Sequence, residues 1–129
     1  MLPQIDQDFL THRSPGHSVA MDGGMIAVLL PDFALPPGLN QPAADLLLRL
    51  SPGYPDVAPD MWWFSPALAR ADGRGIAATE VVEVHLGRRW QRWSRHLGAG
   101  QWRAGIDSLE SFVALVHKEL VAAARNLAA

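Results

Sequence analysis

The densest group of residues able to do chemistry lies between residues 88 and 103. This arginine–tryptophan stretch holds five arginines and three tryptophans and no acidic residue. Tryptophan and arginine are the side chains that most often anchor protein–protein interfaces. The pattern therefore predicts a protein-docking surface, and its expected binding residues are Trp90, Arg92, Trp93, Arg95, His96 and Trp102.

Two other interpretations of the arginine–tryptophan stretch stay open. In the first, the tryptophans seal the core, while the arginines are solvated or stack on the rings. In the second, arginines between aromatic residues bind single-stranded nucleic acid. The net charge of −2 and the lack of a nucleic-acid-binding motif argue against this second interpretation.

The sequence offers little to catalyse a reaction. It has no cysteine, which excludes a thiolate nucleophile, a disulfide and a thiolate metal site together. It has no Gly-x-Ser-x-Gly turn of a serine hydrolase. Its histidines lack metal-binding spacing; they are His12, His17, His85, His96 and His117. We therefore expect no catalytic residue, no metal and no cofactor. We expect His96 to bond the end of its own helix, where positive charge is favoured.

These side chains are positioned by four segments with strand character. Asp-Gly between apolar runs indicates a hairpin, and prolines bracketing an apolar run favour a strand over a helix. Because neighbours on a strand face opposite sides, one of Trp62 and Trp63 should enter the core. The other either packs on the opposite face or is exposed as a partner-binding patch. The predicted strands are 17–21, 25–30, 43–50 and 60–64, and Pro31–Pro42 is predicted to be a loop.

Helical segments flank these strands. Residues 1–13 suit a short helix or an extended arm. Arg88–Leu97 is predicted to be a short helix on which Trp90 and Trp93 share a face. A capping box and apolar residues at helical spacing predict a longer helix over Ser108–Leu127.

These elements predict an α+β fold, a four-stranded antiparallel meander with helices packed on one face. The length suits one domain, residues 1–129. No apolar run approaches the roughly 20 residues that a membrane-spanning helix needs, and the first residues do not look like a signal peptide. We therefore expect a cytoplasmic protein that does not contact a membrane.

The order of elements, with Tyr54-Pro55 at the corner between the third and fourth strands, resembles the ubiquitin-conjugating-enzyme superfamily. More narrowly, the sequence resembles the prokaryotic family E branch. The likeness extends over nearly the whole chain. The residues that carry it are Leu2-Pro3, Leu46-Leu47-Leu48, Pro52–Asp56, Pro59–Met61, Arg89–His96 and Trp102–Leu109. The resemblance implies the ubiquitin-conjugating fold.

The sequence departs from this superfamily where the chemistry should occur. In the superfamily a His-Pro-Asn turn and a catalytic cysteine follow the corner. Here Ser65-Pro66-Ala67 matches the turn, and the thiol's place falls on Ala77, or on Ala78 if the register slips by one. An alanine methyl group is neither a nucleophile nor a leaving group, and Thr79 carries only an unactivated hydroxyl. The chain is either a naturally silent homologue or an active conjugating enzyme whose cysteine near Ala77 was replaced.

The resemblance also implies partners. Bacterial relatives occur beside ubiquitin-like proteins, activating-enzyme-like adenylyltransferases and JAB-type metalloproteases. We therefore expect a pseudoenzyme that serves as a binding or adaptor component of a bacterial ubiquitin-like modification system. An active conjugating enzyme is the alternative function, and a small nucleic-acid-binding module is the third.

Overall fold

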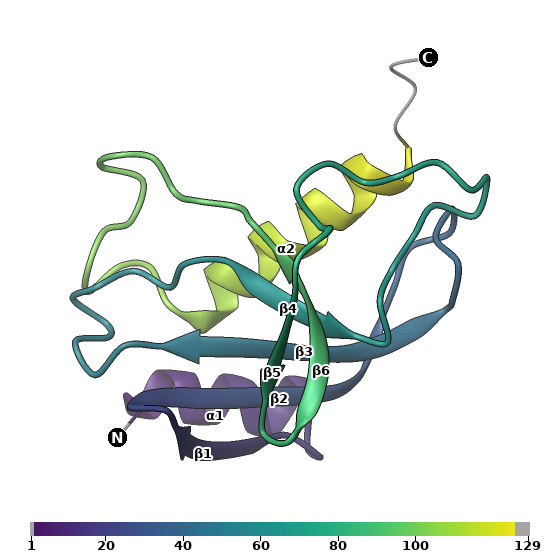
Figure 1. The fold of residues 1–129 in the computed structure, drawn as a ribbon. Coiled ribbons are helices and arrows are strands. Elements are labelled where there is room, and N and C mark those ends of the chain that lie inside the picture. Colours follow the sequence, from purple (N-terminus) through teal and green to yellow (C-terminus); the bar gives the residue numbers. More distant parts are fainter. Residues whose placement is uncertain (1, 126–129) are drawn as a thin grey trace.

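The computed structural model describes residues 2–125 and has an α+β architecture, with a six-stranded antiparallel sheet and two helices (Figure 1). The strands lie side by side in the order β1-β2-β3-β4-β6-β5. In this part of the chain no helix is long and apolar enough to cross a bilayer. The elements are α1 (Gln4–Arg13), β1 (Ser18–Asp22), β2 (Met25–Ala34), β3 (Ala43–Leu50), β4 (Trp62–Ser65), β5 (Val82–His85), β6 (Arg88–Trp93) and α2 (Leu109–Ala124).

The first hairpin is confirmed. Asp22 pairs with Met25, so the turn between β1 and β2 consists of Gly23 and Gly24. Both glycines have positive φ, 58° and 79°, as the tightest hairpin turns require. Strand β3 also occupies the predicted residues, and the first residues form the helix α1 rather than an extended arm.

The loop predicted over Pro31–Pro42 is partly wrong, because β2 continues through its first residues to Ala34. The pairing of β2 with β3 shifts register between Leu30 and Phe33, which marks a bulge. Asp32 adopts a φ of 51° within it. The bulge accommodates Pro31, which has no amide hydrogen to give to the ladder, and it returns Phe33 to the core.

The helix predicted over Arg88–Leu97 is wrong, because residues 88–93 form strand β6. Leu86 and Gly87 have φ values of 54° and 72° and turn the chain back, so that β6 pairs with both β5 and β4. The sheet therefore has six strands in the described residues rather than the predicted four. Residues three apart on a strand face opposite sides, so Trp90 and Trp93 do not share a face.

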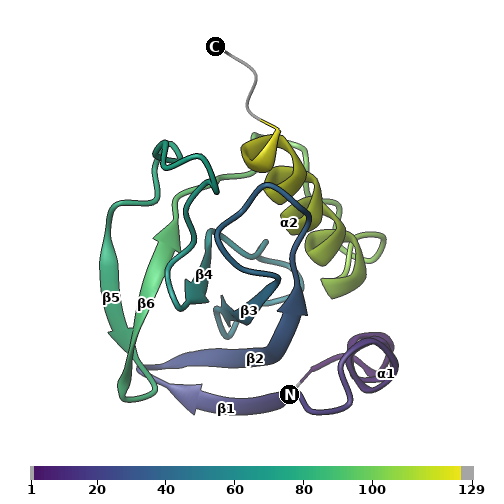
Figure 2. The same ribbon diagram turned by 90° about the vertical axis from the view of Figure 1, so that its right-hand side faces the viewer.

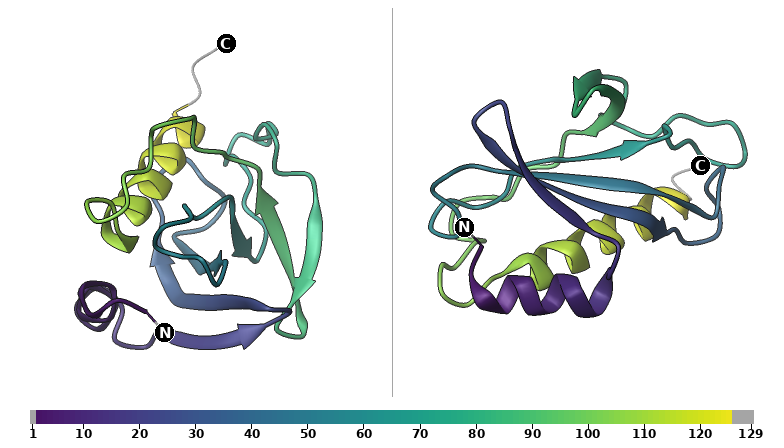
Figure 3. Two further views of the ribbon diagram at one scale, coloured as in Figure 1. Left: turned by 90° about the vertical axis from the view of Figure 1, so that its left-hand side faces the viewer. Right: turned by 90° about the horizontal axis from the view of Figure 1, so that it is seen from below.

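Both helices lie on one face of the sheet, as predicted (Figures 2 and 3). Apolar side chains of α2 meet the sheet there, where Phe112 packs edge-on against Trp62 at 5.8 Å between ring centroids. Ser108 and Ser111 form the expected capping box at the start of α2. The described helix ends at Ala124, and the predicted end at residue 127 lies outside the described residues.

The β5–β6 hairpin covers part of the opposite face. A second, smaller apolar cluster lies beneath it and contains Ala27, Leu47, Trp63 and Trp90. Trp63 donates its indole N–H to Glu83 of β5 at 2.8 Å, and Trp90 donates to the carbonyl of His85 at 3.0 Å. Trp62 belongs to the main core. The two neighbouring tryptophans therefore pack on opposite faces, which is one of the two predicted alternatives.

Candidate functional site

A buried carboxylate fixes the position at which α2 begins. Asp6 of α1 accepts hydrogen bonds from the Tyr54 hydroxyl at 2.7 Å and from the amide of Leu109 at 3.0 Å. Burial, and then the hydrogen bond and charge of Asp6, raise the pKa of Tyr54 far above its usual value, so the hydroxyl stays a donor. The Tyr-Pro corner is therefore a structural anchor for α2.

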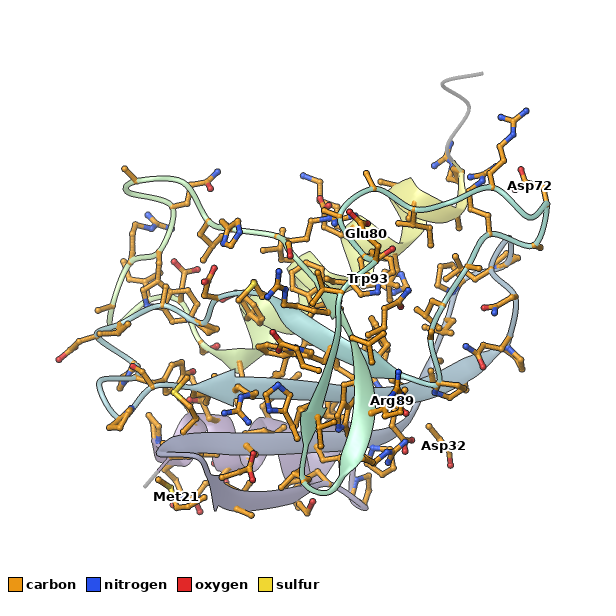
Figure 4. The ribbon with its side chains drawn as sticks, in the orientation of Figure 1. Met21, Asp32, Asp72, Glu80, Arg89 and Trp93 are labelled. Carbon is orange, nitrogen blue, oxygen red and sulfur yellow. The ribbon has the colours of Figure 1, made fainter. Side chains whose placement is uncertain are left out.

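A second contact holds the opposite end of α2. The Arg70 side chain donates to the carbonyl of Ala123 at 2.7 Å and also bonds both carboxylate oxygens of Asp72. This hydrogen bond to Arg70 lowers the pKa of Asp72 to about 2. Gly38 packs so closely that a Cβ atom there would lie 2.8 Å from the carbonyl oxygen of Ala124. The loop that carries Asp72 is thereby fastened to the helix end (Figure 4).

The segment in which the resemblance to the superfamily places the thiol, residues 77–78, crosses the surface between β4 and β5. Ala77 and Ala78 are both exposed. The backbone of this segment is held by β6 and the residues after it: Ser94 donates its amide to the carbonyl of Ala78 at 3.0 Å, and the Arg95 guanidinium donates to the carbonyl of Ala77 at 2.9 Å. The methyl groups of Ala77 and Ala78 are therefore exposed on a backbone that two hydrogen bonds hold in place.

The hydroxyl nearest to this position is already engaged. Thr79 is buried, and its Oγ1 donates to the carbonyl of Ile76 at 2.7 Å. The neighbouring Glu80 carboxylate accepts a hydrogen bond from the Thr79 amide at 2.8 Å, and within residues 2–125 no hydrogen bond joins it to the Thr79 hydroxyl. In this arrangement the Thr79 hydroxyl is buried and not activated, and Ala77 and Ala78 offer no nucleophile.

Three adjoining hollows of about 250, 310 and 200 Å³ lie along α2, and Ala77 lines the last of them. The first two share Leu97, Gln101, Phe112 and Leu115, and the last two share Arg95 and Glu119. We call this feature the α2 groove. Its apolar floor and polar rim are typical of sites that bind a peptide or a small molecule.

The rim of the α2 groove carries charges of both signs. Arg95 pairs with Glu119 at 3.0 Å, and its guanidinium lies 4.9 Å from the ring centroid of Trp93. The prediction that His96 bonds a helix end is wrong, because no helix forms there; its Nδ1 instead lies 2.6 Å from a carboxylate oxygen of Asp60. Residues 2–125 hold no cluster of three or more His, Cys, Asp or Glu side chains suited to a metal ion.

The structure separates the six predicted binding residues. Arg95, His96 and Trp102 line the α2 groove, and Trp102 donates its indole N–H to the carbonyl of Pro55 at 2.8 Å. Trp90 and Trp93 are completely buried, so the core-sealing interpretation describes both rings. Arg92 pairs with Glu83 at 2.9 Å on the opposite face of the sheet.

The arginines of the stretch form no continuous basic surface. Arg88 pairs with Asp45, Arg92 with Glu83 and Arg95 with Glu119. The side chains of Arg92 and Arg95 are only 28% and 20% exposed. Arg95 stacks on Trp93, as the core-sealing interpretation allows, whereas Arg92 is held by Glu83. The structure gives no support to binding along a nucleic-acid backbone.

Sequence reasoning missed the contribution of α2 to the groove. Leu115, Lys118, Glu119 and Ala122 line it from one side of the helix. Their spacing of three and four residues is the signal of a shared helical face, and it was available in the sequence. The sequence analysis predicts a helix over part of the facing segment, residues 95–102, and this helix does not form. The groove between that segment and α2 could therefore not be predicted.

Comparison with known proteins agrees with this geometry. The sequence model of the prokaryotic E2 family E matches residues 2–123. The chain belongs to this family. No curated protein and no solved structure matches it significantly. A thioester needs a thiol, and this member of the prokaryotic E2 family E has no cysteine.

Proposed function

We propose that this member of the prokaryotic E2 family E is a catalytically silent adaptor in a bacterial ubiquitin-like modification system. It binds the ubiquitin-like protein, or the activating-enzyme-like adenylyltransferase, without forming a covalent adduct. The observation that carries the proposal is the exposed Ala77 at the end of the α2 groove. The α2 groove supports docking, and the lack of any cysteine supports the absence of covalent transfer.

The α2 groove suits an extended segment of a partner better than a compact ligand. Three hollows follow one another along the helix rather than forming one deep cavity. Trp62, Leu97 and Phe112 line the middle hollow, where Arg95, Lys118 and Glu119 supply charges. An extended chain gains apolar contacts along such a floor, while charged groups at the rim fix its direction. We assign this role to a terminal segment of the ubiquitin-like protein in the cytoplasm.

The first test is an adduct assay. The protein is mixed with ATP and with the ubiquitin-like protein and adenylyltransferase of the same bacterium, and products are separated with and without reducing agent. We expect no thioester or ester adduct, because no thiol is present and the Thr79 hydroxyl is bonded to Ile76. A band shift sensitive to reducing agent or to hydroxide contradicts the silent function and supports an active conjugating enzyme.

The variant Ala77→Cys is the matched positive control, with Ala78→Cys as its neighbour. If Ala77 occupies the thiol's place, an adduct forms with Ala77→Cys and less readily with Ala78→Cys. Ala78 has a φ of 59°, and its side chain is therefore held in a different direction. Adduct formation only with Ala78→Cys would move the register by one residue and leave the silent function intact.

A further inference from the structure

Strand β5 is an edge of the sheet, and its short length and the charge of Glu83 are its main protections against pairing. The described residues include eight exposed large hydrophobic side chains, and four of these lie on or beside β5: Val81, Val82, Val84 and Leu86. Val82–His85 contains no lysine, proline or bulge. An exposed, apolar edge of this kind is a template for pairing with another chain.

The backbone of β5 offers hydrogen bonds to a further strand. Arg92 donates its amide to the carbonyl of Val81 at 2.8 Å, and the residues of an antiparallel strand point alternately toward and away from their partner. Val82 and Val84 therefore direct their N–H and C=O groups away from β6. Their side chains are 46% and 66% exposed. The same two residues thus present free backbone groups and apolar side chains.

The length of β5 argues against a second copy of this chain as the occupant. The strand has four residues, and self-pairing of so short a strand would bury far less than the roughly 1,200 Å² at the lower end of stable interfaces. A peptide is not limited in this way, because it can also contact the exposed side chains beside the strand. We therefore turn to what those neighbouring side chains would recognise.

Arg89 favours a negatively charged peptide beside β5. It is paired directly with Val84 in the sheet, so its side chain lies on the face that carries Val82 and Val84. The ion pairs of Arg88 and Arg92 lie on the other face of the hairpin, and within residues 2–125 no carboxylate lies within 4.0 Å of Arg89. Arg89 projects from the hairpin in Figure 4.

A hollow next to Arg89 gives the peptide's side chains a place to pack. Its volume is about 280 Å³, and Val82 and Arg89 line it together with Pro66 and Ala67. A side chain on an added strand would lie about 5 Å from β5 and about 10 Å from β6. A long acidic side chain spans this distance to the flexible guanidinium of Arg89. The surface therefore combines a backbone edge, an apolar row and one positive charge.

From this geometry we infer that β5 binds an extended, apolar and acidic peptide segment of a partner protein. The peptide adds as a strand beside β5, packs β-branched side chains on Val82 and Val84, and directs a carboxylate to Arg89. This surface is separate from the α2 groove, since β5 and α2 lie on opposite sides of the molecule (Figures 2 and 3). The inference therefore holds or fails independently of the proposed function.

The test uses a synthetic eight-residue peptide, capped at both ends, whose odd positions alternate between valine and glutamate and whose even positions are threonine. Valine and glutamate then share the face that meets Val82, Val84 and Arg89. A second peptide carries lysine in place of glutamate. NMR titration of the labelled full-length protein reports the site. We expect the glutamate peptide to shift the amide signals of Val82 and Val84 and to slow their hydrogen exchange. The lysine peptide should bind more weakly.

Two variants separate strand addition from unspecific contact. Val84→Pro removes an amide that points away from β6, so it should abolish peptide binding and leave the melting temperature nearly unchanged. Met21→Pro is the matched control: by the same alternation its amide points outward from the other edge strand, β1. Arg89→Glu should weaken the glutamate peptide about two- to fivefold and strengthen the lysine peptide.

Three outcomes would overturn the inference. The first is equal binding by the Val84→Pro variant and the unaltered protein, and the second is equal loss from Met21→Pro and Val84→Pro. The third is a concentration-dependent dimer in sedimentation that Val84→Pro dissolves, since this would make a second copy the occupant. If Val84→Pro fails to fold, Arg89→Glu alone tests the inference. A variant that binds the lysine peptide better than the glutamate peptide requires contact between the peptide and residue 89, and unchanged relative affinities would overturn the inference.

Discussion

At the residue scale, one buried carboxylate connects three parts of the chain that are remote in sequence. Asp6 is 1% exposed and receives hydrogen bonds from Tyr54 and from Leu109. A buried charge is tolerated only when such donors satisfy it. The start of α2 also favours a negative charge, since its first amides are otherwise unpaired. The Tyr-Pro corner therefore serves the packing of α2 rather than chemistry.

The variant Asp6→Asn should destabilise the protein by about 1–3 kcal/mol. The amide group of asparagine cannot accept with both of its polar atoms, so either Tyr54 or Leu109 loses its acceptor. Asp8→Asn is the matched control on the same helix, because Asp8 is exposed and bonds only Gln4 among the described residues. Urea unfolding measures the stability of both variants. Equal midpoints would show that the hydrogen bonds to Asp6 contribute nothing to the stability of the fold.

At the scale of elements, α2 is the helix that builds the candidate site, and both of its ends are fastened. Its beginning rests on Asp6, and Arg70 from the loop after β4 bonds the carbonyls at its end. The Arg95–Glu119 ion pair ties its middle to the segment after β6. The α2 groove thus lies between elements that cannot move apart without breaking these bonds.

The fastening of the helix end should depend on pH through Asp72. Arg70 depresses the pKa of this carboxyl from 3.8 to about 2. A group whose pKa is lower in the folded state adds stability above its unfolded pKa, and this stability is lost as the pH falls through the folded value. Asp72→Asn should therefore lower the melting temperature at pH 7, and the difference from the unaltered protein should shrink between pH 4 and pH 2.

Asp56→Asn provides the comparison for that measurement. Asp56 is exposed, and no hydrogen bond to its side chain is found in residues 2–125. Its variant should follow the unaltered protein at both pH values. A pH-independent effect of Asp72→Asn would mean that the contribution comes from the shape of the loop and not from the charge of the carboxylate.

At the scale of the whole molecule, the two candidate surfaces lie apart. The α2 groove, with Ala77 at its end, runs along α2, and β5 forms the edge of the sheet on the other side of the molecule (Figure 2). A protein that joins two partners needs two surfaces that do not compete. This arrangement favours an adaptor over a carrier that holds one partner covalently.

Filling the groove should block the partner without disturbing the fold. Ala122 is exposed and lines the hollow that contains Ala77, so Ala122→Arg should reduce the affinity for the ubiquitin-like protein about tenfold, or about 1.4 kcal/mol. Ala114→Arg makes the same change at another exposed alanine of α2 that does not line the groove. Arginine is a good helix former, so both variants should melt like the parent.

Calorimetric titration of each variant with the ubiquitin-like protein supplies the result. Equal affinity for Ala122→Arg and Ala114→Arg would place the docking surface elsewhere. Because α2 and β5 lie on opposite sides of the molecule (Figure 2), binding of the valine–glutamate peptide should be unaffected by Ala122→Arg. This independence distinguishes the two surfaces experimentally.

The sequence by itself determined the features that depend on local chemistry. Gly23 and Gly24 indicate the first hairpin because few other residues accept positive φ, and the capping box at Ser108 locates the start of α2. The absence of cysteine rules out a thioester on this chain whatever its fold. These conclusions needed no knowledge of which segments meet in space.

Tertiary structure decided the conformation of the arginine–tryptophan stretch and the burial of its side chains. Residues 88–93 have a pattern that suits a helix or a strand, and the choice depends on hydrogen bonds to β4, which lies more than 20 residues earlier. That pairing sends Trp93 into the main core and Trp90 to the opposite face. It also divides the arginines among three carboxylates, those of Asp45 and Glu119 from distant segments and that of Glu83 from the neighbouring strand β5. Local sequence could not reveal this, because the partners that fix each side chain are brought close only by folding.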